Sequence, residues 1–137
     1  MSAQKILVAD DSRTIRALVR RPLAANGYDV ILASDGLEAV QLARRENPDL
    51  VILDIQMPEM DGYTACQEIL ALSEDLASVP IIFLTKVKAQ HLKTLGNDLG
   101  AYLQKPVPDN LLLETVSQLL GKPNAAASAE SSNQAAL

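Results

Sequence analysis

Short apolar runs alternate with amphipathic helical segments along residues 6–120, and no other feature of the sequence constrains the fold as strongly. Five runs are predicted strands: residues 6–9, 29–33, 50–53, 79–84 and 101–104. Apolar residues at helical spacing predict helices between Ser12 and Gly27 and at residues 37–45, 63–72, 88–95 and 110–120. Strands that are apolar along their whole length are buried on both faces. The pattern therefore predicts an α/β fold, a doubly wound five-stranded parallel sheet with helices on both faces.

Several predicted helix ends carry residues that suit helix termini. Ser12 and Asp61 are predicted N-caps, because a short polar side chain can accept a hydrogen bond from an otherwise unpaired backbone N–H. Gly27 is predicted to end the first helix in the left-handed conformation. Pro22 lies inside that helix, where it removes one hydrogen bond and is expected to kink the helix.

The composition limits the class of protein. A chain of 137 residues with 48% apolar residues can bury a sizeable core, and one domain is predicted at residues 1–121. Residues 122–137 consist largely of Ala, Ser, Asn and Gln and are predicted to be a disordered tail. The formal net charge is −5, and Arg-Arg pairs are the densest basic clusters. Direct nucleic-acid binding is therefore not expected.

The sequence also carries expectations about location and cysteine chemistry. No apolar run approaches the roughly 18 residues that a membrane span needs, so membrane insertion is not expected. The N-terminus reaches Asp10 and Asp11 too soon for a secretory signal, which favours a cytoplasmic location. Cys66 is the only cysteine, so neither an intrachain disulfide nor a cysteine zinc site is expected, and a buried thiol is predicted.

Polar residues follow four of the predicted strands at their carboxyl ends. Asp10 and Asp11 follow the first strand, Asp54 the third, Thr85 the fourth and Lys105 the fifth. Each residue alone suits an ordinary strand end or helix start. Because ligands of open α/β sheets bind beyond the carboxyl ends of the strands, their joint placement predicts one functional site.

The acidic residues of this predicted site require positive charge. Two carboxylates about 5 Å apart repel each other by roughly 3 kcal/mol at an effective dielectric constant of 20. Clustered carboxylates without histidine or cysteine suit a hard cation, and Mg²⁺ also accepts phosphate oxygens as ligands. Asp54 is the candidate nucleophile of a metal-assisted phosphoryl transfer, since an ionised carboxylate needs no general base.

Four further motifs stand out: VADDS at residues 8–12, LDIQMPEMDG at 53–62, FLT at 83–85 and YLQKP at 102–106. Together they resemble the receiver domain of two-component response regulators, the CheY-like family. The resemblance covers residues 5–121 and implies a flavodoxin-like sheet with strand order 2-1-3-4-5. It also implies that Asp54 accepts a phosphoryl group from a sensor histidine kinase.

The same resemblance implies a magnesium site. Asp11 and Asp54 would bind Mg²⁺ directly, and the backbone carbonyl of Gln56 would complete the protein ligands. Asp10 would act mostly through water. Magnesium is thus the one cofactor expected from the family pattern.

Further residues receive roles from the resemblance. Lys105 and Thr85 would contact the phosphoryl group, and Thr85 and Tyr102 would form the switch that reshapes a surface for a downstream protein. The peptide bond between Lys105 and Pro106 would be cis. That expectation comes from the family alone, because only about 5–6% of X-Pro bonds in folded proteins are cis.

Two features depart from the family pattern. Lys86 follows Thr85 where a small residue is usual, and we interpret it as a solvated surface side chain. The segment before Tyr102 is two residues shorter than usual, so the switch role transfers to Tyr102 less directly than the acidic site does.

The leading hypothesis is a stand-alone phospho-accepting switch that acts through protein contacts, since no effector domain follows Gly121. An aspartate-nucleophile phosphohydrolase is the first alternative, but Gln56 stands where such enzymes place their second aspartate. An FMN carrier is the second alternative, although Asp10 and Asp11 would repel its phosphate. A pseudo-receiver that is never phosphorylated stays open.

Overall fold

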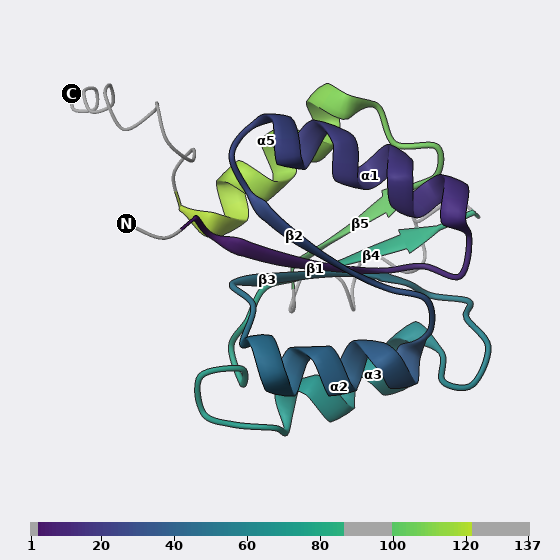
Figure 1. Ribbon diagram of the computed structural model, residues 1–137, viewed down its shortest axis with the longest axis vertical. Helices are drawn as coiled ribbons and strands as arrows, with labels where there is room; N and C mark the ends of the chain where they lie inside the picture. Colours follow the sequence, from purple (N-terminus) through teal and green to yellow (C-terminus); the bar gives the residue numbers. More distant parts are fainter. Residues whose placement is uncertain (1–2, 87–99, 122–137) are drawn as a thin grey trace.

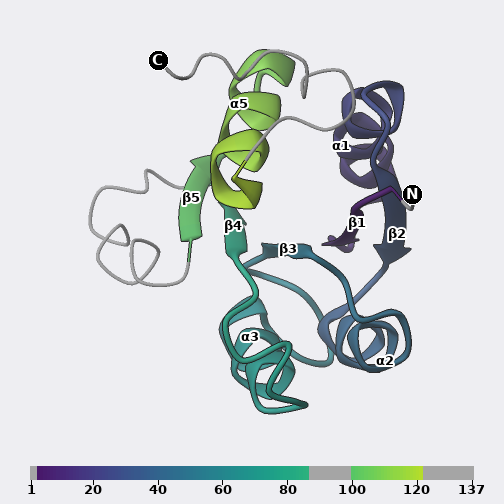
Figure 2. The same ribbon diagram turned by 90° about the vertical axis from the view of Figure 1, so that its left-hand side faces the viewer.

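A five-stranded parallel sheet lies between two layers of helices in the computed structural model of the chain, which describes residues 3–86 and 100–121 (Figure 1). The strands are β1 (Lys5–Ala9), β2 (Asp29–Ala33), β3 (Leu50–Asp54), β4 (Ile81–Thr85) and β5 (Gly100–Gln104), in the order β2-β1-β3-β4-β5. Helices α1 (Arg13–Ala25) and α5 (Asp109–Leu120) cover one face, and α2 (Gly36–Glu46) and α3 (Gly62–Leu70) cover the other (Figure 2). The predicted fold and strand order are confirmed.

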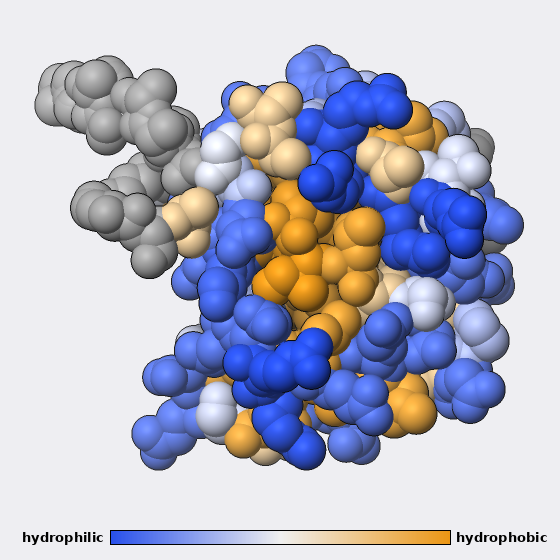
Figure 3. All heavy atoms as spheres, viewed as in Figure 1, coloured by the Kyte–Doolittle hydropathy of each residue, from blue (hydrophilic) through white to orange (hydrophobic). Residues whose placement is uncertain are grey.

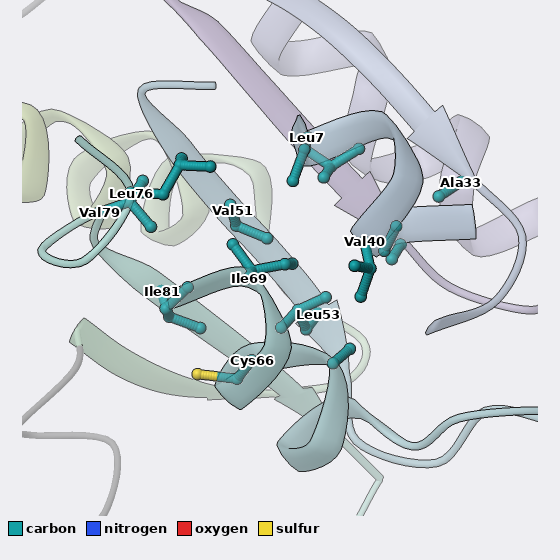
Figure 4. Packing of buried hydrophobic residues seen from close by; sticks show 14 of the residues in the cluster. Leu7, Ala33, Val40, Val51, Leu53, Cys66, Ile69, Leu76, Val79 and Ile81 are labelled. Carbon is teal, nitrogen blue, oxygen red and sulfur yellow. The ribbon is translucent and has the colours of Figure 1, made fainter. Parts of the chain in front are cut away.

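Alternate residues of the central strands supply two separate halves of the core. Against α2 and α3, Leu53 and Ile81 pack with Ile69 and other apolar side chains (Figure 4). On the opposite face, Ile52 and Leu84 pack with residues of α1 and α5. All five residues of β3 and of β4 are buried. This double burial is why these strands read as continuous apolar runs in the sequence.

The predicted caps of α1 and α3 are present. The Ser12 hydroxyl accepts a hydrogen bond from the Ile15 N–H at 3.2 Å, and the Asp61 carboxylate accepts one from Thr64 N–H at 2.8 Å. Gly27, just beyond α1, has a φ of 92°, as its predicted left-handed conformation requires. Pro22 lies inside α1, which continues past it to its last residue.

Some predicted boundaries were wrong by one or two residues. The fourth strand begins at Ile81 rather than at residue 79, because the Val79 N–H closes a turn onto the Leu76 carbonyl. Helix α3 ends at Leu70 rather than at residue 72: the Ala71 N–H is shared between the Gln67 and Glu68 carbonyls, and the Leu72 N–H bonds three residues back to Ile69, as in a final tight turn. The predicted helix at residues 88–95 and the predicted tail at 122–137 lie outside the described residues.

Within residues 3–86 and 100–121, none of the helices has both the length and the apolar character that crossing a membrane requires.

Candidate functional site

Three carboxylates meet at the carboxyl ends of the strands. Asp10 and Asp11 follow β1 and Asp54 is the last residue of β3, and one carboxylate oxygen from each lies within 4.8 Å of the other two. Asp10 is fully buried and Asp54 is 4% exposed, whereas Asp11 is exposed. The sequence prediction that separate stretches of chain bring these acids together therefore holds in the structure.

Lys105 places a positive charge between two of these acids. Its ammonium lies 2.8 Å from Asp10 Oδ2 and 3.2 Å from Asp54 Oδ1, and its side chain is buried. Burial opposes the charge on the lysine, but the hydrogen bonds and charges of the two aspartates outweigh burial and raise its pKa. Lys105 therefore stays charged and neutralises part of the acidic cluster.

The backbone holds Lys105 at this position. Its N–H donates to the carbonyl of Thr85 at the end of β4, with a distance of 2.7 Å. The peptide bond between Lys105 and Pro106 is cis. Thr85 itself is buried at the end of its strand, beside this connection.

Asp10 is held by the first turn of α1. One carboxylate oxygen accepts the Ser12 N–H at 2.9 Å, and the Arg16 guanidinium donates to the Asp10 backbone carbonyl at 2.7 Å. The other carboxylate oxygen, Oδ2, forms the ion pair with the ammonium of Lys105. This oxygen is thus directed at the cationic side of the site.

Asp54 is the acid with the most perturbed ionisation. Burial and, next, the charge of Asp10 raise its pKa from 3.8 to about 6, although Lys105 and the Gln56 N–H, at 3.3 Å, oppose this rise. Asp54 is therefore mostly ionised at neutral pH, and its negative charge is held at an energetic cost. Gln56 itself is exposed on the loop after β3.

The donor set fits a hard divalent cation. Its three convergent groups are all carboxylates, and buried Asp10 and Asp54 face exposed Asp11 across the cluster. Mg²⁺ prefers carboxylate and water oxygens and keeps several of its own waters, so one exposed acid beside two buried ones suits it. Burial and, next, the charge of Asp10 make the negative charge of Asp54 unfavourable, which is the electrostatic reason to bind such an ion.

Gly62 brings the start of α3 against the end of β3. Its N–H donates to the Ile55 carbonyl at 2.9 Å, and a Cβ on Gly62 would overlap the backbone oxygen of Asp54. In the sequence, Gly62 stands out only as the last residue of the LDIQMPEMDG motif, since the close approach of two backbones becomes visible only in three dimensions.

Tyr102 lies on β5 in a row of aromatic rings and not among the acids. The Phe83 ring centroid is 5.1 Å from both the Tyr102 and the Tyr63 ring centroids. The Tyr102 hydroxyl donates to the Tyr63 hydroxyl at 3.0 Å. Burial and, next, this hydrogen bond raise the pKa of Tyr102. Sequence reasoning missed Tyr63, whose only signal was a second tyrosine directly after the MPEMDG motif.

Two remaining residues agree with their interpretations. Lys86 is exposed, as predicted for a surface lysine. Cys66 is buried within the core half beneath α3, and burial raises the pKa of its thiol to about 11 (Figure 4). A thiol with such a pKa is almost wholly protonated at neutral pH, so Cys66 is a packing residue.

Comparison with solved structures finds the same architecture. The receiver domain of sensor histidine kinase PA1611 from Pseudomonas aeruginosa PAO1, solved with a magnesium ion in its active-site cleft, is 32% identical, with a TM-score of 0.77 over 88% of this chain and 100% of that one. The chemotaxis response regulator CheY4 of Vibrio cholerae is 32% identical, with a TM-score of 0.78 over 86% of this chain and 99% of that one.

Comparison of the chain with known protein sequences agrees with the comparison of structures. Response regulator MprA of Mycobacterium leprae is 39% identical over 129 residues, which cover 93% of this chain and 55% of that protein. The chain thus spans about half the length of the curated relatives it matches. Residues 6–117 match the profile of the response regulator receiver domain. On this evidence, the chain belongs to the family of response regulator receiver domains.

Proposed function

We propose that this chain is a phospho-accepting switch in which Asp54 receives a phosphoryl group from a sensor histidine kinase. The observation that carries the proposal is the contact of Lys105 with both Asp10 and Asp54 at the carboxyl ends of the strands, beside exposed Asp11. This arrangement combines an ionised oxygen nucleophile with fixed positive charge, which is what phosphoryl transfer needs from a protein. We assign the activity to residues 1–121.

In the transfer step, a carboxylate oxygen of Asp54 forms a bond to phosphorus while the N–P bond of the donor phosphohistidine breaks. The electron pair of the N–P bond stays on that ring nitrogen, the donor's other ring nitrogen keeps its proton, and the histidine leaves as neutral imidazole; the product is an acyl phosphate on Asp54. Because Asp54 is mostly ionised at neutral pH, no general base is required. A site made of acids, a lysine and a threonine is therefore sufficient, because none of these residues has to act as a general base.

Asp10, Asp11, Asp54 and the backbone carbonyl of Gln56 are the proposed ligands of Mg²⁺. When bound, the ion supplies charge neutralisation to the carboxylates and to the incoming phosphoryl oxygens. The magnesium-bound receiver domain from Pseudomonas aeruginosa supports this assignment by analogy. The convergence of three carboxylates supports it from this chain's own residues.

Lys105 and Thr85 are the proposed phosphoryl-binding residues. The Lys105 ammonium already contacts Asp54 Oδ1 at 3.2 Å, so it lies within reach of a group attached to that carboxylate. Thr85 ends the neighbouring strand β4 and shares a backbone hydrogen bond with Lys105. A charged donor of this kind forms stronger hydrogen bonds to phosphate than a neutral one.

The output we propose is a change in contacts with another protein, transmitted through Thr85 and Tyr102. Tyr102 is tied to β4 and α3 through Phe83 and Tyr63, so a shift at Thr85 on β4 has a packed path to its ring. Catalysis on outside substrates is less well supported, because exposed Gln56 replaces the second aspartate of aspartate-nucleophile phosphohydrolases.

Phosphorylation with a small donor tests this proposal. We expect incubation with acetyl phosphate and Mg²⁺ to add one phosphoryl group, detected by intact-protein mass spectrometry, and we expect EDTA to prevent it. Asp54→Asn should abolish the gain, whereas the exposed control Asp75→Asn should retain it. No gain in the wild-type protein, or an undiminished gain in Asp54→Asn, would show that Asp54 is not the acceptor.

A further inference from the structure

Strand β2 leaves one edge of the sheet open. It is the outermost strand in the order β2-β1-β3-β4-β5, so no described strand pairs with its outer side. Val30 and Ile31 are half-buried and Leu32 is 37% exposed. Figure 1 shows β2 crossing the middle of one face, and hydrophobic residues gather there with hydrophilic residues above and below them (Figure 3).

The hydrogen-bonding groups of this edge alternate in direction. The Asp29 N–H donates to the Gln4 carbonyl, and the Ala33 carbonyl accepts the Asp10 N–H, so the odd-numbered residues of β2 bond toward β1. By the alternation of a parallel ladder, Val30 and Leu32 direct their N–H and C=O groups away from the sheet. These groups can pair with an added strand.

Four arginines of α1 lie beside this open edge. They surround a hollow of about 400 Å³ whose lining consists of Arg13, Arg16, Ala17, Arg20, Arg21 and Leu32. Within the described part of the chain, Arg13, Arg20 and Arg21 form no ion pair. A concentrated positive patch in a chain of net charge −5 indicates a complementary negative partner.

A second copy of the chain fits this surface poorly. Antiparallel pairing of β2 with its own copy about a two-fold axis normal to the sheet keeps each helix layer on its own face, so the two α1 helices would lie side by side. Arginines would then face arginines. Nucleic acid is also disfavoured, because the chain is acidic overall and Asp11 is exposed just before α1.

We propose that the β2 edge and the α1 arginines form a docking surface for an extended acidic segment of a partner protein. The segment adds as a strand beside β2, and its carboxylates pair with the arginines. Alternate residues of a strand are about 6.6 Å apart and point to one face. Arg16 and Arg20, four residues apart on a helix, are about 6 Å apart along its axis, so carboxylates at alternate positions match this spacing. The residues of the partner segment that lie between these carboxylates are apolar and cover Ile31.

A designed peptide tests the proposal on the full chain. The probe is a capped nine-residue peptide of alternating Glu and Val, titrated into labelled protein and followed by backbone NMR shifts. We expect saturable shifts at the amides of Val30 and Leu32 and binding that weakens as salt is raised. Equal binding of the peptide with Lys in place of Glu would overturn the proposal.

Charge reversal supplies the matched comparison. Arg20→Glu with Arg21→Glu should weaken peptide binding about tenfold, since two ion pairs with the peptide are lost. Arg44→Glu with Arg45→Glu makes the same charge change on α2, on the opposite face of the sheet, and should change affinity less than about threefold. Equal loss in both double variants would show a general charge effect and would refute the site.

Leu32→Pro tests the strand addition separately. The Leu32 N–H points away from β1, so proline removes an outer donor without breaking a hydrogen bond of the existing sheet. We expect native circular dichroism and loss of peptide binding. Undiminished peptide binding by Leu32→Pro would contradict the proposal. So would concentration-dependent dimerisation in sedimentation that Leu32→Pro abolishes. A DNA duplex that binds at the α1 arginines where the peptide does not would contradict it as well.

Discussion

Replacing Asp54 by asparagine should stabilise the metal-free protein at neutral pH. Burial and the charge of Asp10 raise the pKa of Asp54 from 3.8 to about 6. At 1.36 kcal/mol per pKa unit, this rise corresponds to roughly 3 kcal/mol of folding free energy lost when the carboxyl ionises. The amide of the asparagine variant keeps the shape of the carboxyl group and removes its charge. We therefore expect the free energy of unfolding at pH 7 to increase by about 2–3 kcal/mol.

The sign of this effect depends on pH. The folded protein binds the Asp54 proton more tightly than the unfolded chain does. The contribution of this carboxyl to the free energy of unfolding of the wild type therefore falls as pH rises from about 4 to about 6. Below pH 4 the carboxyl is protonated in the folded state, and the advantage of Asp54→Asn should disappear.

Urea unfolding in EDTA, followed by circular dichroism at pH 4 and pH 7, measures both quantities. Asp75→Asn, an exposed aspartate in the turn after α3, controls for the loss of one negative charge. Added Mg²⁺ should narrow the difference at pH 7, because an ion that binds only the folded wild-type site stabilises it. An Asp54→Asn protein that is less stable than wild type at pH 7 in EDTA, or equally stabilised at both pH values, would refute the electrostatic reasoning.

Three further substitutions test other parts of the structure. Tyr63→Phe removes the hydrogen bond that helps to raise the pKa of Tyr102, so an ultraviolet pH titration should show that pKa moving toward its ordinary value; no movement would exclude the contact. Gly62→Ala forces a Cβ against the backbone oxygen of Asp54 and should cost about 2–4 kcal/mol in urea unfolding and reduce labelling by acetyl phosphate; unchanged values would contradict the close approach. Ser12→Ala removes the N-cap of α1 and should cost about 1 kcal/mol by thermal unfolding, with a loss below about 0.3 kcal/mol counting against the cap.

The fold could be predicted from the sequence because strands that are buried on both faces consist of consecutive apolar residues. In β3 and β4 each apolar residue packs in one of the two halves of the core, which requires apolar runs up to the last residue of each strand. Element ends were predicted less well, since the ends of α3 and β4 depend on hydrogen bonds such as that from Val79 to Leu76. Apolar periodicity does not encode these bonds.

The acidic cluster was predictable for a similar reason. Parallel strands bring their carboxyl ends to one edge, so Asp10, Asp54 and Lys105 had to approach one another. The partners of Tyr102 were not predictable, because its contact with Tyr63 depends on how α3 lies against β4 and β5. That orientation has no counterpart in residue spacing.

Arg16 belongs to two parts of the molecule at once. Its guanidinium donates to the backbone carbonyl of Asp10, and its side chain also lines the hollow between α1 and the open strand edge. A partner carboxylate that pulls the Arg16 guanidinium outward breaks the hydrogen bond that this guanidinium donates to the Asp10 carbonyl. Binding of a partner segment at the β2 edge and the position of Asp10 are therefore coupled through the side chain of Arg16.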